Sequence, residues 1–218
     1  MRYNILNDPE LYSARQAKYQ AAVAPAHYDD LTLRGGFYRT LWHEIGHYLG
    51  VDRTADGREL GTALEASANK LEELKADLVS LYLVEALSER GYYTPEAARG
   101  VYADGVRRVL VKNEPSMTQT YRVMQLMQFN YYREKGLLEY HADDNRVVIH
   151  YDGYHQAVTS MLGEVLALQK NGDKAAADAF IEKYFVWEET PHEALSASMK
   201  KAEKYRYAMV RYGILEDR

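Results

Sequence analysis

Residues 43–47 combine two histidines and a glutamate at a spacing suited to metal chemistry, because His43-Glu44-Ile45-Gly46-His47 is a complete H-E-x-x-H motif. Side chains at positions i and i+4 of an α-helix share one face, so the imidazoles of His43 and His47 can reach the same Zn²⁺. Glu44 then lies beside the open coordination position, where it can take a proton from a bound water. A five-residue motif also occurs by chance, so its assignment depends on a third ligand.

A second acidic segment follows at Leu71-Glu72-Glu73-Leu74-Lys75-Ala76-Asp77. Such a segment is ordinarily a solvated helix face, but a catalytic zinc needs three protein ligands and one open position. With the histidine pair upstream, we predict that Glu73 is the third ligand. Asp77 lies one helical turn further along the same face, and Glu72 points about 100° away from Glu73. Each can accept the second N–H of one ligand histidine and so fix its ring.

The composition excludes several other classes of function. With 27 basic and 32 acidic residues the net charge is −5, without the basic surplus expected of a nucleic-acid-binding protein. The absence of cysteine excludes disulfides and cysteine-ligated metals, which leaves histidine and carboxylate ligands. No apolar run reaches transmembrane length and the first residues lack a signal-peptide core. We expect a soluble protein. The composition does not decide its compartment; the cytoplasm is favoured, and the periplasm is the alternative if an N-terminal segment is missing.

Start and stop signals along the chain predict a mostly α-helical fold with one small β-hairpin. The helix that carries the histidines is expected to end at Gly50, and a leucine-striped helix is expected to carry Glu73. We interpret the whole chain, residues 1–218, as a single compact domain. The expected helices span about 9–23, 37–49, 63–90, 95–112, 116–136, 154–170, 174–185 and 191–212, and the hairpin joins 137–141 to 146–151.

With both motifs placed, the chain resembles the dipeptidyl-peptidase III family of zinc metallopeptidases. In that family a zinc helix is followed by a helix with the motif Glu-Glu-x-Arg-Ala-Glu and then by Leu-Tyr-Leu. The counterparts here are residues 72–77, with Lys75 for arginine and Asp77 for the last glutamate, and Leu81-Tyr82-Leu83. The resemblance implies a Zn²⁺ cofactor, a short peptide substrate and Glu73 as a zinc ligand. It also implies that Glu72 and Asp77 are partners of the histidines.

Three features depart from the family pattern. Many members have one more residue between the histidines, so the chain is similar to a bacterial subgroup with the five-residue motif. Tyr48 stands where glycine usually follows the second histidine, and only 42 residues precede His43, whereas the family's upper lobe precedes its zinc helix. The chain is therefore expected to be a fragment of a longer two-lobed enzyme or a minimal relative.

A metallopeptidase also needs a donor that stabilises the developing oxyanion, and in the family a histidine on a later helix has this role. The corresponding stretch, about residues 118–133, contains Tyr121 and Arg122 but no histidine. The histidines outside the motif are His27, His141, His150, His155 and His192. Of these, His150 and His155 flank the exit of the hairpin and could take this role, but each is better interpreted as a surface or structural histidine.

Two functions follow from these residues. The first is zinc-dependent hydrolysis of peptide bonds in short peptides, with Glu44 as the general base. The alternative is a zinc-stabilised domain without catalysis that has a binding or regulatory role. Glu44 favours the first, because a purely structural zinc site does not need a base. The expected partners are a short peptide and an upstream lobe of the same longer protein, with neither nucleic acid nor membrane.

Overall fold

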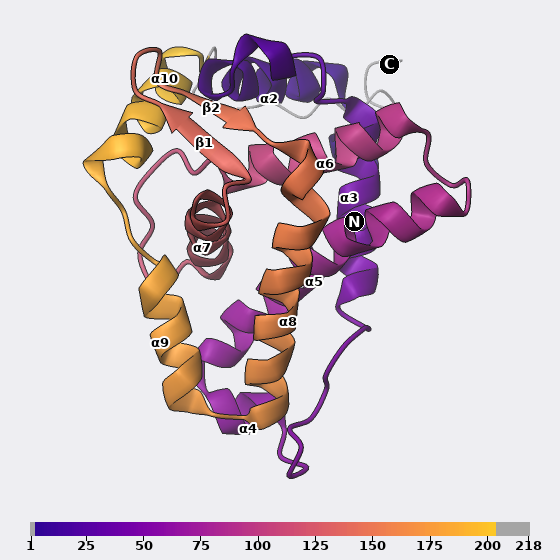
Figure 1. The fold of residues 1–218 in the computed structure, drawn as a ribbon, viewed down its shortest axis with the longest axis vertical. Helices are drawn as coiled ribbons and strands as arrows, with labels where there is room; N and C mark the ends of the chain where they lie inside the picture. The colour runs from indigo at the N-terminus through magenta and orange to yellow at the C-terminus, as the bar shows by residue number, and fades with distance from the viewer. Residues whose placement is uncertain (1–2, 204–218) are drawn as a thin grey trace, which may run out of the picture.

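The computed structural model describes residues 3–203, which form a bundle of α-helices and one β-hairpin (Figure 1). The prediction of a mostly α-helical fold with one small hairpin is therefore confirmed. Of the last predicted helix, residues 204–212 lie outside the described residues. The helices are α1 Tyr3–Leu6, α2 Pro9–Ala22, α3 Leu33–Gly46, α4 Leu60–Leu64, α5 Ala66–Glu89, α6 Pro95–Val109, α7 Thr120–Glu134, α8 Tyr154–Asn171, α9 Lys174–Tyr184 and α10 Ala194–Lys201, and the antiparallel strands are β1 Leu138–His141 and β2 Arg146–Ile149.

Helix α5 is the central element of the described chain, and it packs against α3, α6, α7 and α8. Its leucine stripe is fully buried, as the spacing of these residues predicts for a helix packed on several sides. The stripe consists of Leu71, Leu74, Leu78 and Leu81. Each buried leucine stabilises the fold by about 1.5–3 kcal/mol. Because the stripe sets the rotation of α5, it also sets the directions of Glu72, Glu73 and Asp77.

Helix α3 approaches its neighbours closely because glycines lie at its contacts. A Cβ on Gly35 would lie 2.3 Å from the backbone of Gly100 on α6, and one on Gly46 would lie 2.9 Å from the carbonyl oxygen of Ala76 on α5. Thr32 caps the helix, since its hydroxyl accepts a hydrogen bond of 3.0 Å from the Gly35 N–H. The helix thus begins at Leu33, and the predicted start near residue 37 was wrong.

Other boundaries also differ from the sequence prediction, among them the following. Helix α3 ends at Gly46, so His47 is its C-cap, although φ −61° and ψ −27° keep His47 in helical geometry. Glu65, with φ 49°, separates α5 from the short helix α4 within the predicted start of the long helix. Helix α7 begins at Thr120, later than the predicted start at residue 116, and its N-cap is Gln119. The side-chain oxygen of Gln119 accepts a hydrogen bond of 3.1 Å from the Ser116 N–H.

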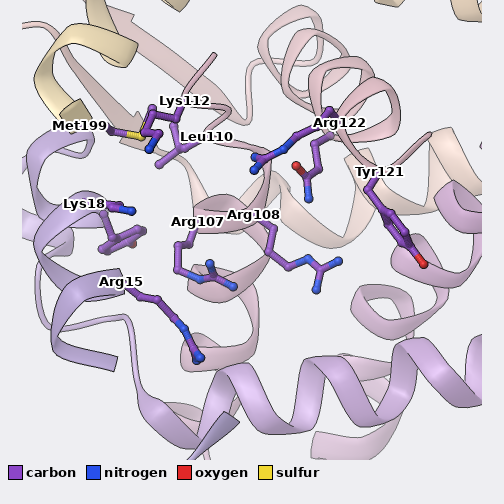
Figure 2. Close-up of a pocket in the computed structure, with 11 residues that line it drawn as sticks. Arg15, Lys18, Arg107, Arg108, Leu110, Lys112, Tyr121, Arg122 and Met199 are labelled. Atoms are coloured by element: carbon purple, nitrogen blue, oxygen red, sulfur yellow. The ribbon is translucent and has the colours of Figure 1, made fainter. Parts of the chain in front are cut away.

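The hairpin lies with α2 and α10 at one end of the molecule, whereas α4 and α9 lie at the other (Figure 1). Between α2, α6, α7 and α10 the packing leaves a cavity of about 460 Å³ (Figure 2). None of the helices in the described part of the chain combines the length and the apolar character needed to cross a bilayer.

Candidate metal centre

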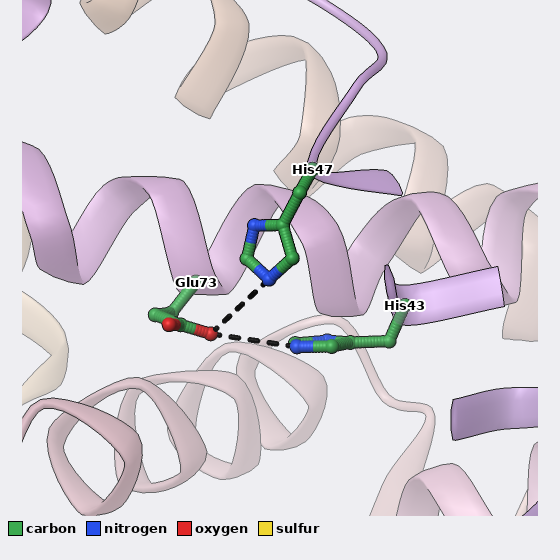
Figure 3. A group of neighbouring side chains, drawn as sticks. All are labelled: His43, His47 and Glu73. Carbon is green, nitrogen blue, oxygen red and sulfur yellow. Dashed lines mark ion pairs between the residues drawn. The ribbon is translucent and has the colours of Figure 1, made fainter. Parts of the chain in front are cut away.

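The side chains of His43 and His47, from the end of α3, meet Glu73 from α5 in one cluster (Figure 3). Oε2 of Glu73 lies 3.4 Å from Nε2 of His43 and 3.7 Å from Nε2 of His47. The two imidazole rings are nearly perpendicular, with an interplanar angle of 85° and centroids 4.8 Å apart. Two nitrogens and one oxygen therefore face a common point.

The two distances from Glu73 fit a bound metal ion, and all three ligand atoms lie within 4.8 Å of one another. Ligand atoms of a tetrahedral zinc, each about 2.0–2.1 Å from the metal, lie about 3.3 Å from one another. Oε2 of Glu73 is buried and has no hydrogen-bond partner among the described residues. Since a buried carboxylate oxygen without a donor is costly, a cation at this point would stabilise it. Two imidazoles and one carboxylate are also a ligand set that Zn²⁺ uses in catalytic sites.

A carboxylate lies behind each imidazole and leaves its Nε2 atom for the metal. Nδ1 of His43 lies 2.7 Å from Oδ1 of Asp77, and Nδ1 of His47 lies 3.2 Å from Oε1 of Glu72. An acceptor at Nδ1 favours the tautomer whose Nε2 carries the free lone pair. The structure thus brings together every residue that the sequence analysis assigned to the metal and to its histidines, while their roles stay predictions.

The electrostatics of the cluster favour charged carboxylates. Burial raises the pKa of Glu73, but His43 and Tyr121 outweigh it, so the pKa lies below its usual value. Burial lowers the pKa of His43, yet Asp77 and Glu73 outweigh this effect and raise it. The cluster therefore already concentrates the negative charge that a divalent cation needs.

The sequence analysis missed the residues that hold Asp77. Arg39, one helical turn before His43, is fully buried and forms an ion pair with Asp77. Gln128 on α7 donates a hydrogen bond of 3.2 Å to Oδ2 of Asp77, the oxygen that also pairs with Arg39. Burial raises the pKa of Asp77, but Arg39 and Arg108 outweigh it and hold the pKa well below its usual range. The i−4 spacing from His43 was the available signal for Arg39.

Lys75 holds the second carboxylate in a similar way. Its side chain is buried, and its ammonium lies 2.8 Å from Oε1 of Glu72. The same group donates a hydrogen bond of 2.7 Å to the carbonyl of Leu49, just beyond the end of α3. Gln169 on α8 donates one of 3.3 Å to the other oxygen of Glu72. Lys75 thus links α5 to the segment that follows His47.

Glu44 and Tyr121 are exposed residues next to the cluster, Glu44 in sequence and Tyr121 through its interaction with Glu73. Glu44 is exposed, and no described residue forms a hydrogen bond or an ion pair with its carboxylate. Tyr121, in the first turn of α7, is 53% exposed. Its interaction with Glu73, then burial and then the charge of Glu44 raise the pKa of Tyr121, so its hydroxyl stays protonated at neutral pH. Tyr121 belongs to the stretch from which the family resemblance implies an oxyanion donor.

The histidines outside the motif all have partners away from the cluster, in agreement with a structural or surface role. His192 is buried, while His141 and His150 are about half exposed. The side-chain partners are Asp30 for His27, Glu139 for His141 and His150, Glu85 for His155 and Asn130 for His192.

No protein-family profile matches the chain. Nudix hydrolase 3 of Arabidopsis thaliana is 29% identical to it over 152 residues, which are 68% of this chain and 20% of that protein. The chain thus spans a fifth of this curated relative, too small a share for the name of the whole protein to describe it.

Two solved structures resemble this one over most of its length. Dipeptidyl-peptidase III from Caldithrix abyssi superposes with a TM-score of 0.82 at 24% identity and covers 92% of the chain, which corresponds to 38% of that structure. Dipeptidyl-peptidase III from Corallococcus sp. strain EGB gives 0.74 at 23% identity, with 88% and 37% covered. The chain spans less than two fifths of either protein. It therefore has the fold of part of a dipeptidyl-peptidase III, and the resemblance indicated by its two motifs is confirmed at that level.

Proposed function

We propose that this chain is the zinc-binding part of a peptidase that hydrolyses short peptides, with His43, His47 and Glu73 as the metal ligands. One observation carries the proposal: the Nε2 atoms of both histidines converge on a buried glutamate oxygen that has no hydrogen-bond partner in the described chain. The dipeptidyl-peptidase III-like fold supports the peptidase assignment. The proposal includes a longer two-lobed enzyme of which residues 1–218 form one α-helical lobe.

The reaction uses the exposed residues next to the cluster. When bound, Zn²⁺ lowers the pKa of a water toward neutrality and polarises the peptide carbonyl. Glu44 takes a proton from the attacking water, whose oxygen bonds to the carbonyl carbon. As the C–N bond breaks, Glu44 delivers that proton to the leaving amine. An exposed carboxylate without a partner is free to do both.

Tyr121 is the proposed donor to the developing oxyanion. Its hydroxyl stays protonated and interacts with Glu73, so it lies beside the metal centre. A neutral O–H aimed at the carbonyl oxygen stabilises the charge that develops there. This assigns to Tyr121 the role that a histidine has in the family.

The competing function is a zinc-stabilised binding or regulatory domain without catalysis. Both functions predict metal binding, but only hydrolysis needs a general base that takes a proton from the attacking water. The exposed Glu44, next to His43 in the chain, supports catalysis, because a purely structural zinc site does not need a base.

Metal analysis and a peptide-cleavage assay test the proposal together. The purified chain should hold one zinc ion after dialysis, and His43→Ala should lose it. His141→Ala is the matched control, because His141 is half exposed and contacts Glu139 away from the cluster. Zinc bound equally by the His43→Ala protein would disprove the assigned site. If a longer chain that contains the rest of the enzyme binds zinc but cleaves no peptide, the regulatory alternative is favoured.

A further inference from the structure

Tyr48 directly follows the proposed ligand His47 and is 91% exposed, more than any other large hydrophobic residue of the described chain. Its side chain has no hydrogen bond, ion pair or ring contact with any described residue. A single exposed tyrosine is ordinary on a protein surface, so the exposure alone assigns no role. The backbone around Tyr48 and the residues beside it distinguish this position.

The backbone on both sides of Tyr48 is held by the buried side chain of Lys75. The ammonium group of Lys75 donates hydrogen bonds to the carbonyls of Leu49, at 2.7 Å, and of His47, at 3.4 Å. Its third partner is Oε1 of Glu72, at 2.8 Å, so all three N–H groups of the lysine have acceptors. These contacts fix residues 47–49 against α5.

Gly50 completes this turn. Its φ of 98° lies in the left-handed region, which glycine adopts without strain. A Cβ at this position would lie 3.0 Å from Cδ of Lys75 and 3.1 Å from Cδ2 of Leu166. The turn therefore packs closely on the lysine stem and presents the ring of Tyr48 to solvent from a fixed backbone. A ligand that contacts this ring has to order only two side-chain torsions, which keeps the entropy cost of binding low.

Tyr48 also lies near the proposed general base. His47 keeps helical dihedral angles, so Tyr48 follows Glu44 by one helical turn and projects from the sector of α3 that carries Glu44 and Ile45. Four helical residues rise about 6 Å, and one residue of an extended peptide spans about 3.3–3.6 Å. A peptide that follows the end of α3 with its cleaved carbonyl beside Glu44 therefore brings a side chain one or two residues away to Tyr48.

Other exposed apolar side chains lie around the same centre. Leu49, next to Tyr48, is 43% exposed, and Tyr121, which interacts with Glu73, is 53% exposed. Of the seven large hydrophobic residues that are exposed in the described chain, three therefore border the metal centre. Exposed apolar area that is concentrated at one place marks a binding surface, whereas scattered exposed residues do not.

We propose that Tyr48 determines the specificity of the enzyme, because its ring packs against a large apolar or aromatic side chain of the peptide one or two residues from the cleaved bond. This inference rests on the proposed peptidase function. Aromatic rings gain from burial of their large apolar faces and, in pairs, from their offset or edge-to-face geometry. Tyrosine is also among the residues that contribute most to binding when a partner covers them.

Calorimetric titration of the zinc-loaded chain with alanine-based hexapeptides tests the inference. One peptide contains only alanine, and each of the others carries a single phenylalanine at a different position. At least one phenylalanine peptide should bind about tenfold or more tightly than the alanine peptide, because burial of the side chain removes a large apolar area from water. The position of that phenylalanine locates the contact relative to the cleaved bond. Equal binding of all the peptides would overturn the inference.

Three variants assign this preference to the ring. Tyr48→Ala should reduce the advantage of the phenylalanine peptide to about twofold or less, and Tyr48→Phe should retain it, because the ring rather than the hydroxyl makes the contact. Tyr92→Ala is the matched control, since Tyr92 is 72% exposed and lies beyond the end of α5, about 24 Å along the helix axis from Glu73. Zinc affinity should be the same in all three. A preference that survives Tyr48→Ala unchanged would contradict the proposal.

Cleavage assays separate this inference from the proposed function. A preference that depends on Tyr48 in a protein that binds no zinc and cleaves no peptide would support the peptide contact and disprove the peptidase. Zinc-dependent cleavage with equal kcat/KM for the alanine and phenylalanine peptides would leave the peptidase standing and overturn the inference.

The remaining part of a longer enzyme is the other possible occupant of this surface. In that case Tyr48→Ala would destabilise the longer chain toward urea but not residues 1–218 alone, and the peptide preference would stay unchanged. This result would assign the ring to a contact within the enzyme and overturn the inference.

Discussion

Oδ1 of Asp77 lies 2.7 Å from Nδ1 of His43, while the other oxygen of the same carboxylate pairs with the buried guanidinium of Arg39. Asp77 therefore orients a proposed metal ligand and also neutralises a cation in the core. Glu72, at 30% side-chain exposure, contacts His47 and pairs with the buried Lys75, whose ammonium also has the carbonyl of Leu49 as an acceptor. The two carboxylates behind the histidines are thus unequal in their importance for folding.

Replacing these carboxylates should have different consequences. Glu72→Ala should weaken zinc affinity about 10–100-fold but keep the fold, because Lys75 retains the carbonyl of Leu49 as an acceptor. Asp77→Ala should weaken zinc affinity and also destabilise the chain by about 3–5 kcal/mol, because it leaves Arg39 buried without a partner. Chelator competition measures affinity and urea unfolding measures stability. Equal unfolding free energies for the two variants would contradict this assignment.

Gly46 should be required for the geometry of the metal centre. A Cβ at this position would lie 2.9 Å from the carbonyl oxygen of Ala76, so Gly46→Ala must push α3 away from α5. We expect a loss of about 1–3 kcal/mol of stability, as for other overpacked sites, and weaker zinc binding because the histidines move away from Glu73. Gly163→Ala on α8 is the control, since no atom lies within 4 Å of its added Cβ. Unchanged zinc affinity in Gly46→Ala would show that the helices adjust.

Glu44→Gln separates metal binding from catalysis. The variant should retain zinc, because Glu44 is not a proposed ligand, and should lose about 10²–10⁴-fold in turnover, because an amide cannot accept the proton of the water. Zinc content and peptide cleavage are measured on the same sample. We expect weak turnover even from the unmodified 218-residue chain, which spans 38% of the Caldithrix abyssi structure, since positioning of the substrate supplies several kcal/mol of catalysis. Full activity of Glu44→Gln would eliminate the proposed mechanism.

Tyr121→Phe removes the proposed oxyanion donor together with the interaction of its hydroxyl with Glu73. The side chain is 53% exposed, so the variant should fold and bind zinc normally. Turnover should fall about 10²-fold or more, the usual loss for one such donor. The decrease should appear in kcat with little change in KM, because the hydrogen bond forms in the transition state. A change confined to KM would instead indicate that Tyr121 binds the substrate in its ground state.

His192 should make stability depend on pH. Its Nδ1 accepts a hydrogen bond of 3.0 Å from the Glu188 N–H, and its Nε2 lies 3.0 Å from the side-chain oxygen of Asn130, so the buried ring is held neutral. Burial and then the charge of Arg133 lower its pKa to about 4. Because the unfolded chain takes up this proton near pH 6.5, stability should fall by about 3 kcal/mol as the pH drops from about 6.5 to about 4.

Thermal unfolding across this pH range compares the unmodified chain with His192→Gln. Glutamine cannot take up the proton, so the stability of the variant relative to that of the unmodified chain should rise as the pH falls. His150→Gln is the comparison, because it removes a half-exposed histidine that contacts Glu139 and not Glu188 or Asn130. Parallel profiles for all three proteins would contradict the role of His192.

The local features of this chain could be predicted from its sequence. The i,i+4 spacing of His43 and His47 places them together on any helix, and the same spacing places Glu73 beside Asp77. The leucine stripe of α5 and the alternating strands of the hairpin are likewise determined by neighbours in sequence, because helix and hairpin hydrogen bonds connect nearby residues. The fold class and the candidate ligands therefore followed from periodicity and motif.

The relations between helices were decided by the tertiary structure. The closeness of Gly46 to Ala76 and the burial of the leucine stripe set how α5 is rotated toward α3, and so Glu73 rather than Glu72 faces both Nε2 atoms. The ion pair between Arg39 and Asp77 is buried between two helices that are separated in the sequence. The cavity is likewise lined by residues of α2, α6 and α7 that lie far apart in the chain. Such contacts depend on how side-chain volumes and charges fit across several elements at once, and this information is absent from the spacing within any one of them.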